Sequence, residues 1–279
     1  MNHLIAQEKI AAFLREDLSF GDASAFLFKE NEGVSGSMVV KQAGILCGQE
    51  IPQIVCDLLG GASYQPFLPD GKQVAAGTVC GRINGKATTI LAGERVILNL
   101  MQRMSGIATA TQNALERLND PSIRLTDTRK TAPGLRLFDK YAVRIGGGCN
   151  HRFDLSAGLM LKDNHLAAKG GIRKALALAT QNAGPLTKVE VEIETKEQLE
   201  SAVKSRVDTI MFDNQRPETI RQWVKLVPAQ ISTEASGGID LTNIAAYRGC
   251  GVDFISLGFL TNEVKPLDIS FVLDGVVKA

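Results

Sequence analysis

The sequence predicts an α/β protein in which a small α+β domain precedes an irregular, incomplete α/β barrel of parallel strands. In the second half of the chain, short apolar runs alternate with helix-like segments, which is typical of parallel strands joined by crossover helices. In the first half, strand-like pieces are interrupted by Gly and Pro. A chain of 279 residues has room for a barrel of about 200 residues and one smaller domain.

The first part of the chain predicts the α+β domain. Apolar residues at helical spacing indicate an amphipathic helix near residues 2–16, which the segment Asp17–Asp22 ends. Strand-like pieces follow, with one helical insert at 51–60. These pieces are SGSMVVKQ, GILCGQ, GASYQPFL, GTVCGRING and KATTIL.

The longest helical pattern, Gly93–Leu118, links the two halves, and Gly106 marks either a break or a close packing point within it. Six strand candidates follow it: SIRLTDTRK, GLMLKDNH, KVEVEIET, TIMFDNQ, QISTEASGG and VDFISLGFL. We place the α+β domain at 1–104, with the C-terminal tail 266–279 packed on it, and the barrel at 105–265.

Polar residues end each of the six strand candidates. Parallel strands gather these ends at one rim, where barrel enzymes keep their active sites. An open doubly wound sheet gathers them at only one switch point, so polar groups at all six ends favour the barrel. Six strands are fewer than the usual eight, which makes the predicted barrel incomplete.

The overall composition narrows the possible partners. There are 31 basic and 30 acidic residues, so nucleic acid is not an expected partner. Five cysteines without a C-x-x-C pair do not suit a disulfide framework and indicate a reducing, cytoplasmic location. We expect a soluble protein without a membrane partner, because the chain shows neither a signal peptide nor a run of about 18 apolar residues.

The segment 126–165 has the composition of an anion-binding site. Its cations stand beside Gly, Asn and His instead of alternating with Glu at helical spacing, as they would on a solvated helix face. These cations are Arg129, Lys130, Arg136, Arg144, Arg152 and Lys162. A merely charged surface is the alternative interpretation.

Carboxylates and glycine turns follow in the later strands. Glu190, Glu192 and Glu194 share one face of a strand, and Asp213 ends the next strand. Such carboxylates suit Mg²⁺, whereas an ion-pair network with Arg129 or Lys162 is the alternative. The turns Ser236–Gly238 and Leu257–Phe259 end the last two strands, where barrels often bind phosphate.

Histidine is scarce, and the three residues His3, His151 and His165 cannot build a His-rich zinc site. We expect His151 and His165 either to hydrogen-bond an anionic substrate or to tie the rim loops together, and for His165 we favour the structural role. Cys149 beside His151 is more simply a small packed residue than a nucleophile.

Several motifs resemble, in order and spacing, those of the quinolinate phosphoribosyltransferase family. They are LNLMQRMSGIAT, DTRKTAPGLR, YAVRIGGGCNHR, KDNH, EVE, FDN, EASGG and SLG, and the resemblance covers nearly the whole chain. It implies an open-faced N-terminal α/β domain, an irregular barrel and a homodimer with shared active sites. It also implies a pentosyltransferase that joins quinolinate to phosphoribosyl pyrophosphate with Mg²⁺, giving nicotinate mononucleotide, carbon dioxide and pyrophosphate for NAD biosynthesis.

The same resemblance implies roles for individual residues. Arg103 is implied to enter the neighbouring subunit's site. Glu192 and Asp213 are implied to lie near Mg²⁺ and the ribose hydroxyls, either directly or through water. The implied catalytic residues are Arg103, Arg129, Lys130, Lys162, Glu192 and Asp213. The implied substrate-binding residues are Thr128, Arg129, Lys130, His151, Arg152, Lys162, Ser236, Gly237, Gly238, Leu257, Gly258 and Phe259.

Three other functions are alternatives to this one. A Schiff-base lyase needs one lysine of depressed pKa in an apolar pocket, but Lys130 and Lys162 stand among other cations. A paralogue associated with molybdate uptake lacks NHR and KDNH in this form. A lipoyl-type carrier needs a lysine at an exposed hairpin tip, and GTVCGRINGKATT does not provide one.

Overall fold

A computed structural model describes residues 1–205 and 207–274, which form two compact units. Unit 1 comprises 1–112, 131–147 and the described part of 263–279, and unit 2 comprises 113–130 and 148–262. The predicted domain limits stay a prediction. By its contacts, segment 131–147 belongs to unit 1, and residues 275–279 of the predicted tail lie outside the described part of the chain.

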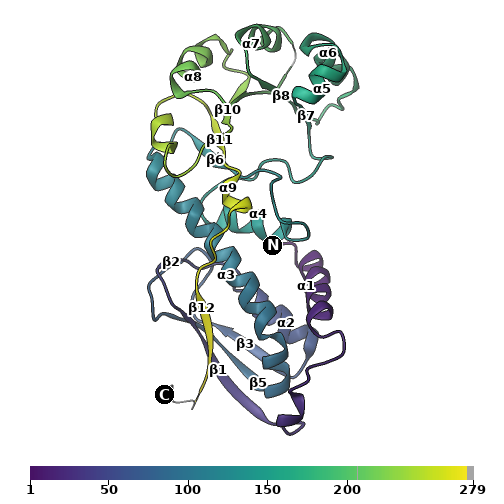
Figure 1. The fold of residues 1–279 in the computed structure, drawn as a ribbon, viewed down its shortest axis with the longest axis vertical. Coiled ribbons are helices and arrows are strands. Elements are labelled where there is room, and N and C mark those ends of the chain that lie inside the picture. The colour runs from purple at the N-terminus through teal and green to yellow at the C-terminus, as the bar shows by residue number, and fades with distance from the viewer. Residues whose placement is uncertain (206, 275–279) are drawn as a thin grey trace. The chain divides into compact units, whose positions relative to one another are not determined.

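Unit 1 is built around a four-stranded antiparallel sheet of order β12-β1-β5-β3, beside a two-stranded sheet β2-β4 (Figure 1). Its strands are β1 (Gly33–Val40), β2 (Gly44–Ile45), β3 (Ala62–Pro66), β4 (Gln73–Val74), β5 (Val79–Lys86) and β12 (Ile269–Leu273). Its helices are α1 (His3–Asp17), the short η1 (Ala25–Leu27), α2 (Ile51–Leu59), most of α3 (Ala87–Leu118) and α4 (Arg136–Ile145).

Local sequence explains how these helices begin and pack. Asn2 caps α1 by accepting a hydrogen bond from the Ile5 N–H, and Ala6, Ile10 and Leu14 form its buried stripe. The predicted helices at 2–16 and 51–60 are therefore confirmed by α1 and α2.

The long helix α3 differs from the prediction at its start. KATTIL was expected to be a strand because of its β-branched residues, but α3 already begins at Ala87. Ala87, Ile90 and Ile97 are buried at helical spacing, so the burial of one helix face outweighs the strand preference of the two threonines. A Cβ built on Gly106 would lie only 2.3 Å from the Lys265 carbonyl oxygen, so Gly106 is a close packing point and not a break.

Unit 2 contains one six-stranded parallel sheet of order β6-β11-β10-β9-β8-β7. All six predicted strands are confirmed, and they are β6 (Arg124–Thr126), β7 (Leu159–Leu161), β8 (Val189–Ile193), β9 (Thr209–Asp213), β10 (Ser232–Ser236) and β11 (Phe254–Ser256). No pairing joins β6 to β7 within the described residues. The sheet therefore remains open, as the prediction of an incomplete barrel requires.

Helices α5 (Asp163–Ala168), α6 (Ile172–Asn182), α7 (Lys196–Val203) and α8 (Pro217–Trp223) flank the outer side of this sheet (Figure 1). Unit 2 also contains η2 (Val224–Leu226), η3 (Ile244–Tyr247) and α9 (Phe259–Asn262). In β8, Val189, Val191 and Ile193 are fully or almost fully buried, while Glu190 and Glu192 extend from the opposite face. None of the helices among the described residues is long and apolar enough to cross a membrane.

Candidate active site

The predicted site residues of unit 2 collect at the carboxyl edge of its sheet. Thr128, Arg129 and Lys130 follow β6, Lys162 follows β7, and Asp213 is the last residue of β9. Because all six strands are parallel, these ends lie along one edge. The topology therefore brings together residues that are up to about 130 positions apart in the sequence.

Asp127 fixes the segment that crosses from Gly148 to Gly158. Its side chain is fully buried, and it accepts hydrogen bonds from Asn150 Nδ2 at 2.5 Å and from the His151 N–H at 2.9 Å. Both bonds are charge-assisted and therefore stronger than neutral ones. Sequence reasoning missed this residue, although an Asp directly after a buried strand was an available signal.

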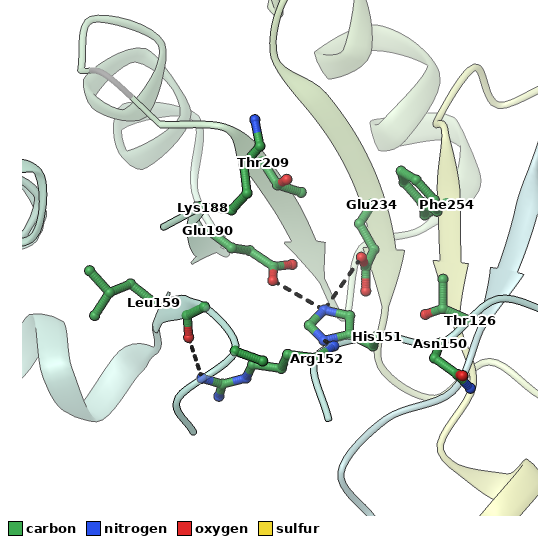
Figure 2. A pocket seen from close by; sticks show the side chains of 12 residues that line it. Thr126, Asn150, His151, Arg152, Leu159, Lys188, Glu190, Thr209, Glu234 and Phe254 are labelled. Carbon is green, nitrogen blue, oxygen red and sulfur yellow. Dashed lines mark hydrogen bonds and ion pairs between the residues drawn. The ribbon is translucent and has the colours of Figure 1, made fainter. Parts of the chain in front are cut away.

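The NHR motif is ordered further by its own contacts. His151 Nδ1 accepts a hydrogen bond from the Arg152 N–H at 2.8 Å, and Arg152 Nη1 donates to the Gly158 carbonyl at 3.1 Å (Figure 2). His151 Nε2 lies 3.1 Å from Glu190 Oε2. In this arrangement His151 contacts Glu190 and the Arg152 backbone, while Arg152 presents its guanidinium at the pocket (Figure 2).

The charge of one guanidinium group of the site, Arg129, acts on the other, Arg152. Burial lowers the pKa of Arg152, and the nearby charge of Arg129 lowers it further, whereas Glu190 and Glu192 oppose the change. Arg129 Nε is buried without a hydrogen-bond partner among the described residues. Two neighbouring cations with an unused buried donor form a site that an anion would complete.

Lys162 and Glu192 form an ion pair and a hydrogen bond between the ends of neighbouring strands. Burial raises the pKa of Glu192, the charges of Asp213 and Glu190 raise it further, and Lys162 opposes them. The ion-pair alternative to a metal site is thus realised for Glu192 through Lys162. Asp213 accepts a hydrogen bond from Asn214 Nδ2 at 2.8 Å.

The two glycine turns adopt conformations that bring backbone close to other groups. Gly237 and Gly238 have φ values of +88° and +61°, a region that favours glycine. A Cβ on Gly237 would lie 2.2 Å from Asn214 Oδ1, and one on Gly258 would lie 3.1 Å from Lys130 Cδ. The Leu257–Phe259 turn is therefore packed against Lys130, whose carbonyl also accepts a bond from Thr261 Oγ1 at 2.8 Å.

Arg103 belongs to unit 1, whereas the other predicted site residues belong to unit 2. It makes a bidentate ion pair with the fully buried Asp139, through Nε at 2.7 Å and Nη2 at 2.9 Å. Burial raises the pKa of Asp139, and Arg103 opposes that change. Asp139, which the sequence did not reveal as relevant, thus holds the guanidinium in one orientation.

His165, the cysteines and Glu234 complete the description of the site region. His165 has the expected structural role, since its Nδ1 accepts from the Lys162 N–H at 3.0 Å at the start of α5. All five cysteines are free, and Cys149 is partly buried. Glu234 is a second residue that sequence reasoning missed. It is 3% exposed, and its Oε2 lies 3.7 Å from His151 Nε2.

Comparison with known proteins identifies the family. The quinolinate phosphoribosyl transferase N-terminal domain matches residues 19–105, and the C-terminal domain of the same family matches residues 107–272. A probable nicotinate-nucleotide pyrophosphorylase [carboxylating] of Bacillus subtilis is 48% identical over 97% of this chain and 94% of its own length. The nicotinate-nucleotide pyrophosphorylase [carboxylating] of Homo sapiens is 35% identical over 95% of this chain and 90% of its own.

Solved structures agree with these relatives. The crystal structure of NadC from Streptococcus pyogenes superposes with a TM-score of 0.92 at 39% identity, covering 97% of this chain and 96% of that one. A nicotinate-nucleotide pyrophosphorylase from Francisella tularensis also gives 0.92 at 34% identity, with 98% of each chain covered. The open parallel sheet, the separate antiparallel unit and these matches together show that the chain belongs to the quinolinate phosphoribosyltransferase family.

Proposed function

We propose that this chain transfers the phosphoribosyl group of phosphoribosyl pyrophosphate to quinolinate and that the residues at the carboxyl edge of unit 2 bind both substrates. Family membership supports the reaction. The observation that supports the site is the pair formed by Arg129 and Arg152, in which the charge of Arg129 lowers the pKa of Arg152 and Arg129 Nε has no hydrogen-bond partner among the described residues. A dicarboxylate such as quinolinate relieves both conditions at once.

The charges of the substrates explain the number of cations. Quinolinate has two carboxylates and phosphoribosyl pyrophosphate has several phosphate charges, so their transfer from water needs many compensating donors. Planar guanidinium groups match carboxylates bidentately, whereas Lys130 and Lys162 act as point charges suited to phosphates. The turns Ser236–Gly238 and Leu257–Phe259 offer backbone close to Asn214 and Lys130, where the 5′-phosphate would bind.

The reaction proceeds by bond changes in the substrates alone. The pyridine nitrogen forms a bond to the anomeric carbon, the bond from that carbon to the pyrophosphate oxygen breaks, and its electron pair leaves with pyrophosphate. The ring nitrogen is then cationic. The bond to the 2-carboxylate breaks, carbon dioxide leaves, and its electron pair stays on the ring carbon, which takes up a proton. Arg129, Arg152 and Lys162 position and neutralise the anions, so that orientation and electrostatics supply the rate.

Glu192 and Asp213 are the residues that would hold Mg²⁺. Each is a carboxylate on the same sheet edge, from neighbouring strands β8 and β9, and Mg²⁺ commonly takes one or two protein carboxylates together with substrate phosphates and water. Glu192 is already paired with Lys162, which fits a metal that arrives with phosphoribosyl pyrophosphate better than a tightly resident one. When bound, Mg²⁺ would neutralise charge on the departing pyrophosphate.

We also propose a homodimer in which Arg103 completes the partner subunit's site. Arg103 is not in the unit that holds the other site residues, and Asp139 fixes its orientation. Unit 1 also exposes large apolar side chains, which are Leu4 (78%), Phe20 (102%), Phe26 (82%) and Leu27 (66%). A partner subunit would remove such side chains from water. The free cysteines suit a reducing compartment, and the cytoplasm is the proposed location.

Complementation between inactive variants tests the shared site. Arg103→Ala and Lys162→Ala should each be inactive alone. If Arg103 acts in the neighbouring subunit, a mixed dimer has one intact site, and random mixing should recover about a quarter of the wild-type activity. If Arg103 acts within its own chain, neither site of the mixed dimer is intact and mixing recovers nothing.

The reaction itself is tested by incubating the protein with quinolinate, phosphoribosyl pyrophosphate and Mg²⁺ and following nicotinate mononucleotide and carbon dioxide. Wild type should turn over, and Arg129→Ala should lose at least about 10²-fold in kcat/KM. The exposed Arg173→Ala, in α6 of the same unit, is the matched control and should behave as wild type. Folded, dimeric protein without turnover would exclude quinolinate as the acceptor.

A further inference from the structure

Asn214 has a backbone conformation that is unusual for its place in the fold. It is one of only two non-glycine residues with a positive φ in the described part of the chain, at +53°, and the other is Asn119 at +45°. Asn119 directly follows helix α3, where a residue in the left-handed region ends many helices. Asn214 instead directly follows strand β9, whose last residue is the proposed site residue Asp213. The end of a helix therefore does not explain the conformation of Asn214.

The side chain of Asn214 makes a contact that a glycine at this position could not make. Glycine adopts a positive φ without strain, whereas asparagine only tolerates it. Asn214 Nδ2 donates a hydrogen bond to Asp213 Oδ2 at 2.8 Å. Rotation of the Asp213 carboxylate would break this bond, so the bond favours one direction for the second carboxylate oxygen. The side chain thus acts on the carboxylate that the proposed function assigns to Mg²⁺ and the ribose hydroxyls.

The neighbouring strand β10 holds Asn214 in place. The Asn214 N–H donates to the Ser236 carbonyl at 2.9 Å, and Asp213 and Ser236 are partners in the register of β9 and β10. The amide group lies against Gly237, where an added Cβ would be 2.2 Å from Asn214 Oδ1 and 2.6 Å from Asn214 Cγ. Such distances are too short for any real Cβ atom. Ser236 therefore supplies the backbone contact, and Gly237 the space, that fix Asn214 beside Asp213.

We propose that Asn214 is a positioning residue that fixes the Asp213 carboxylate relative to the Ser236–Gly238 turn. This inference rests on the proposed function, which assigns the turn to the 5′-phosphate and Asp213 to Mg²⁺ and the ribose hydroxyls. The phosphate and the sugar belong to one ligand, phosphoribosyl pyrophosphate. A fixed spacing between the two binding groups means that they need not be ordered when the ligand binds. Asn214 contributes to the binding of phosphoribosyl pyrophosphate through Asp213 and not by a contact of its own.

The exposure of Asn214 separates this role from a structural one. Asn214 is exposed, so water can replace its lost hydrogen bond and its side chain contributes little to the stability of the fold. A glycine at this position relieves the positive φ but adds conformational entropy to the unfolded chain, and these two effects oppose each other. We therefore expect Asn214→Gly to weaken binding without a loss of stability. A merely structural residue would show the reverse.

Asn119→Gly is the matched control, because Asn119 is also exposed, has a positive φ and lies in unit 2. Both variants should keep the melting temperature within about 2 °C of wild type. Calorimetric titration with phosphoribosyl pyrophosphate and Mg²⁺, without quinolinate, should show wild-type affinity for Asn119→Gly and affinity weaker by about fivefold or more for Asn214→Gly. Wild-type affinity in Asn214→Gly would overturn the proposal. A clearly larger loss of stability in Asn214→Gly than in Asn119→Gly would identify a structural role and would also overturn it.

A double variant with Asp213→Ala supplies the second test. If Asn214 acts through Asp213, adding Asn214→Gly to Asp213→Ala should weaken binding by no more than about twofold further. Losses that multiply in the double variant would show that Asn214 acts on the ligand by another route, which would overturn the proposal. These titrations involve no turnover. Wild type that binds phosphoribosyl pyrophosphate but does not convert quinolinate would refute the proposed function and leave both tests of Asn214 intact, whereas wild type that does not bind it would refute both proposals.

Discussion

Replacing Asp127 by Asn tests whether a buried carboxylate organises the NHR motif. Asp127 is fully buried and accepts from Asn150 Nδ2 at 2.5 Å and from the His151 N–H at 2.9 Å. Asparagine has the same shape, but it replaces one acceptor oxygen by an NH₂ group that would face a donor. Hydrogen bonds to a charged group contribute about 1.5–3 kcal/mol each. We therefore expect Asp127→Asn to lower the free energy of unfolding by about 2–4 kcal/mol.

Asp240 offers a matched control. It also accepts two hydrogen bonds, from the Thr242 N–H at 2.7 Å and from Thr242 Oγ1 at 2.5 Å, but it is exposed. Water can replace those bonds, so Asp240→Asn should cost no more than about 0.5 kcal/mol. The comparison separates the effect of burial from the effect of removing a carboxylate.

Urea unfolding followed by the fluorescence of Trp223 measures the difference. Trp223 is the only tryptophan and lies in unit 2, the same unit as Asp127. The hydrogen bonds lost in Asp127→Asn hold the segment that contains Arg152. The value of kcat/KM with quinolinate should therefore also fall by more than tenfold, which corresponds to a rise of about 1.4 kcal/mol in the activation free energy. If Asp127→Asn shifts the unfolding midpoint no more than Asp240→Asn does, Asp127 does not organise this segment.

Three further substitutions test the site and the packing around it. Gly237→Ala places a Cβ 2.2 Å from Asn214 Oδ1 at a φ of +88°. In Gly238→Ala the new Cβ meets nothing within 4 Å. Gly237→Ala should therefore raise the KM for phosphoribosyl pyrophosphate more than Gly238→Ala does. Lys162→Met removes the cation that opposes the raised pKa of Glu192. Turnover should fall about 10²-fold or more, and the stability deficit in denaturant unfolding should shrink from pH 8 to 5 as Glu192 takes up a proton. Gly106→Ala directs a methyl group at the Lys265 carbonyl oxygen and should lower the melting temperature by several degrees, about what a loss of 1–3 kcal/mol produces.

The parallel sheet could be predicted because its signals are local. In β8, the alternation of Val and Glu follows the two-residue period of a strand, and the structure buries Val189, Val191 and Ile193 on the opposite face from Glu192. The order of strands and helices then places every strand end at one edge. The KATTIL segment was predicted wrongly because six residues contain too little of a helical period to outweigh two threonines.

The contacts that hold the site together could not be predicted from the sequence. Asp127 is one acidic residue inside a cationic motif, and its partners Asn150 and His151 lie 23 and 24 positions later. Glu234 precedes a glycine turn whose pattern indicates a phosphate site and says nothing about the glutamate. Its partner His151 is 83 positions away. No periodic pattern encodes such pairs, because they arise only when the segment 148–158 crosses the sheet.

The acidic residues on this sheet face differ in the groups that they contact. Glu192 is paired with a lysine that also faces the substrates, so its charge can change partner when phosphate or a metal ion arrives. Glu190 lies 3.1 Å from His151 Nε2, and Nδ1 of the same ring accepts the Arg152 N–H, so Glu190 belongs to the contacts that order the NHR motif. A catalytic centre needs both kinds of group. Side chains whose ion pairs change during the reaction must be held in position by contacts that do not change. On this reasoning, replacing Glu192 by Gln should impair turnover even when Arg152 is correctly placed.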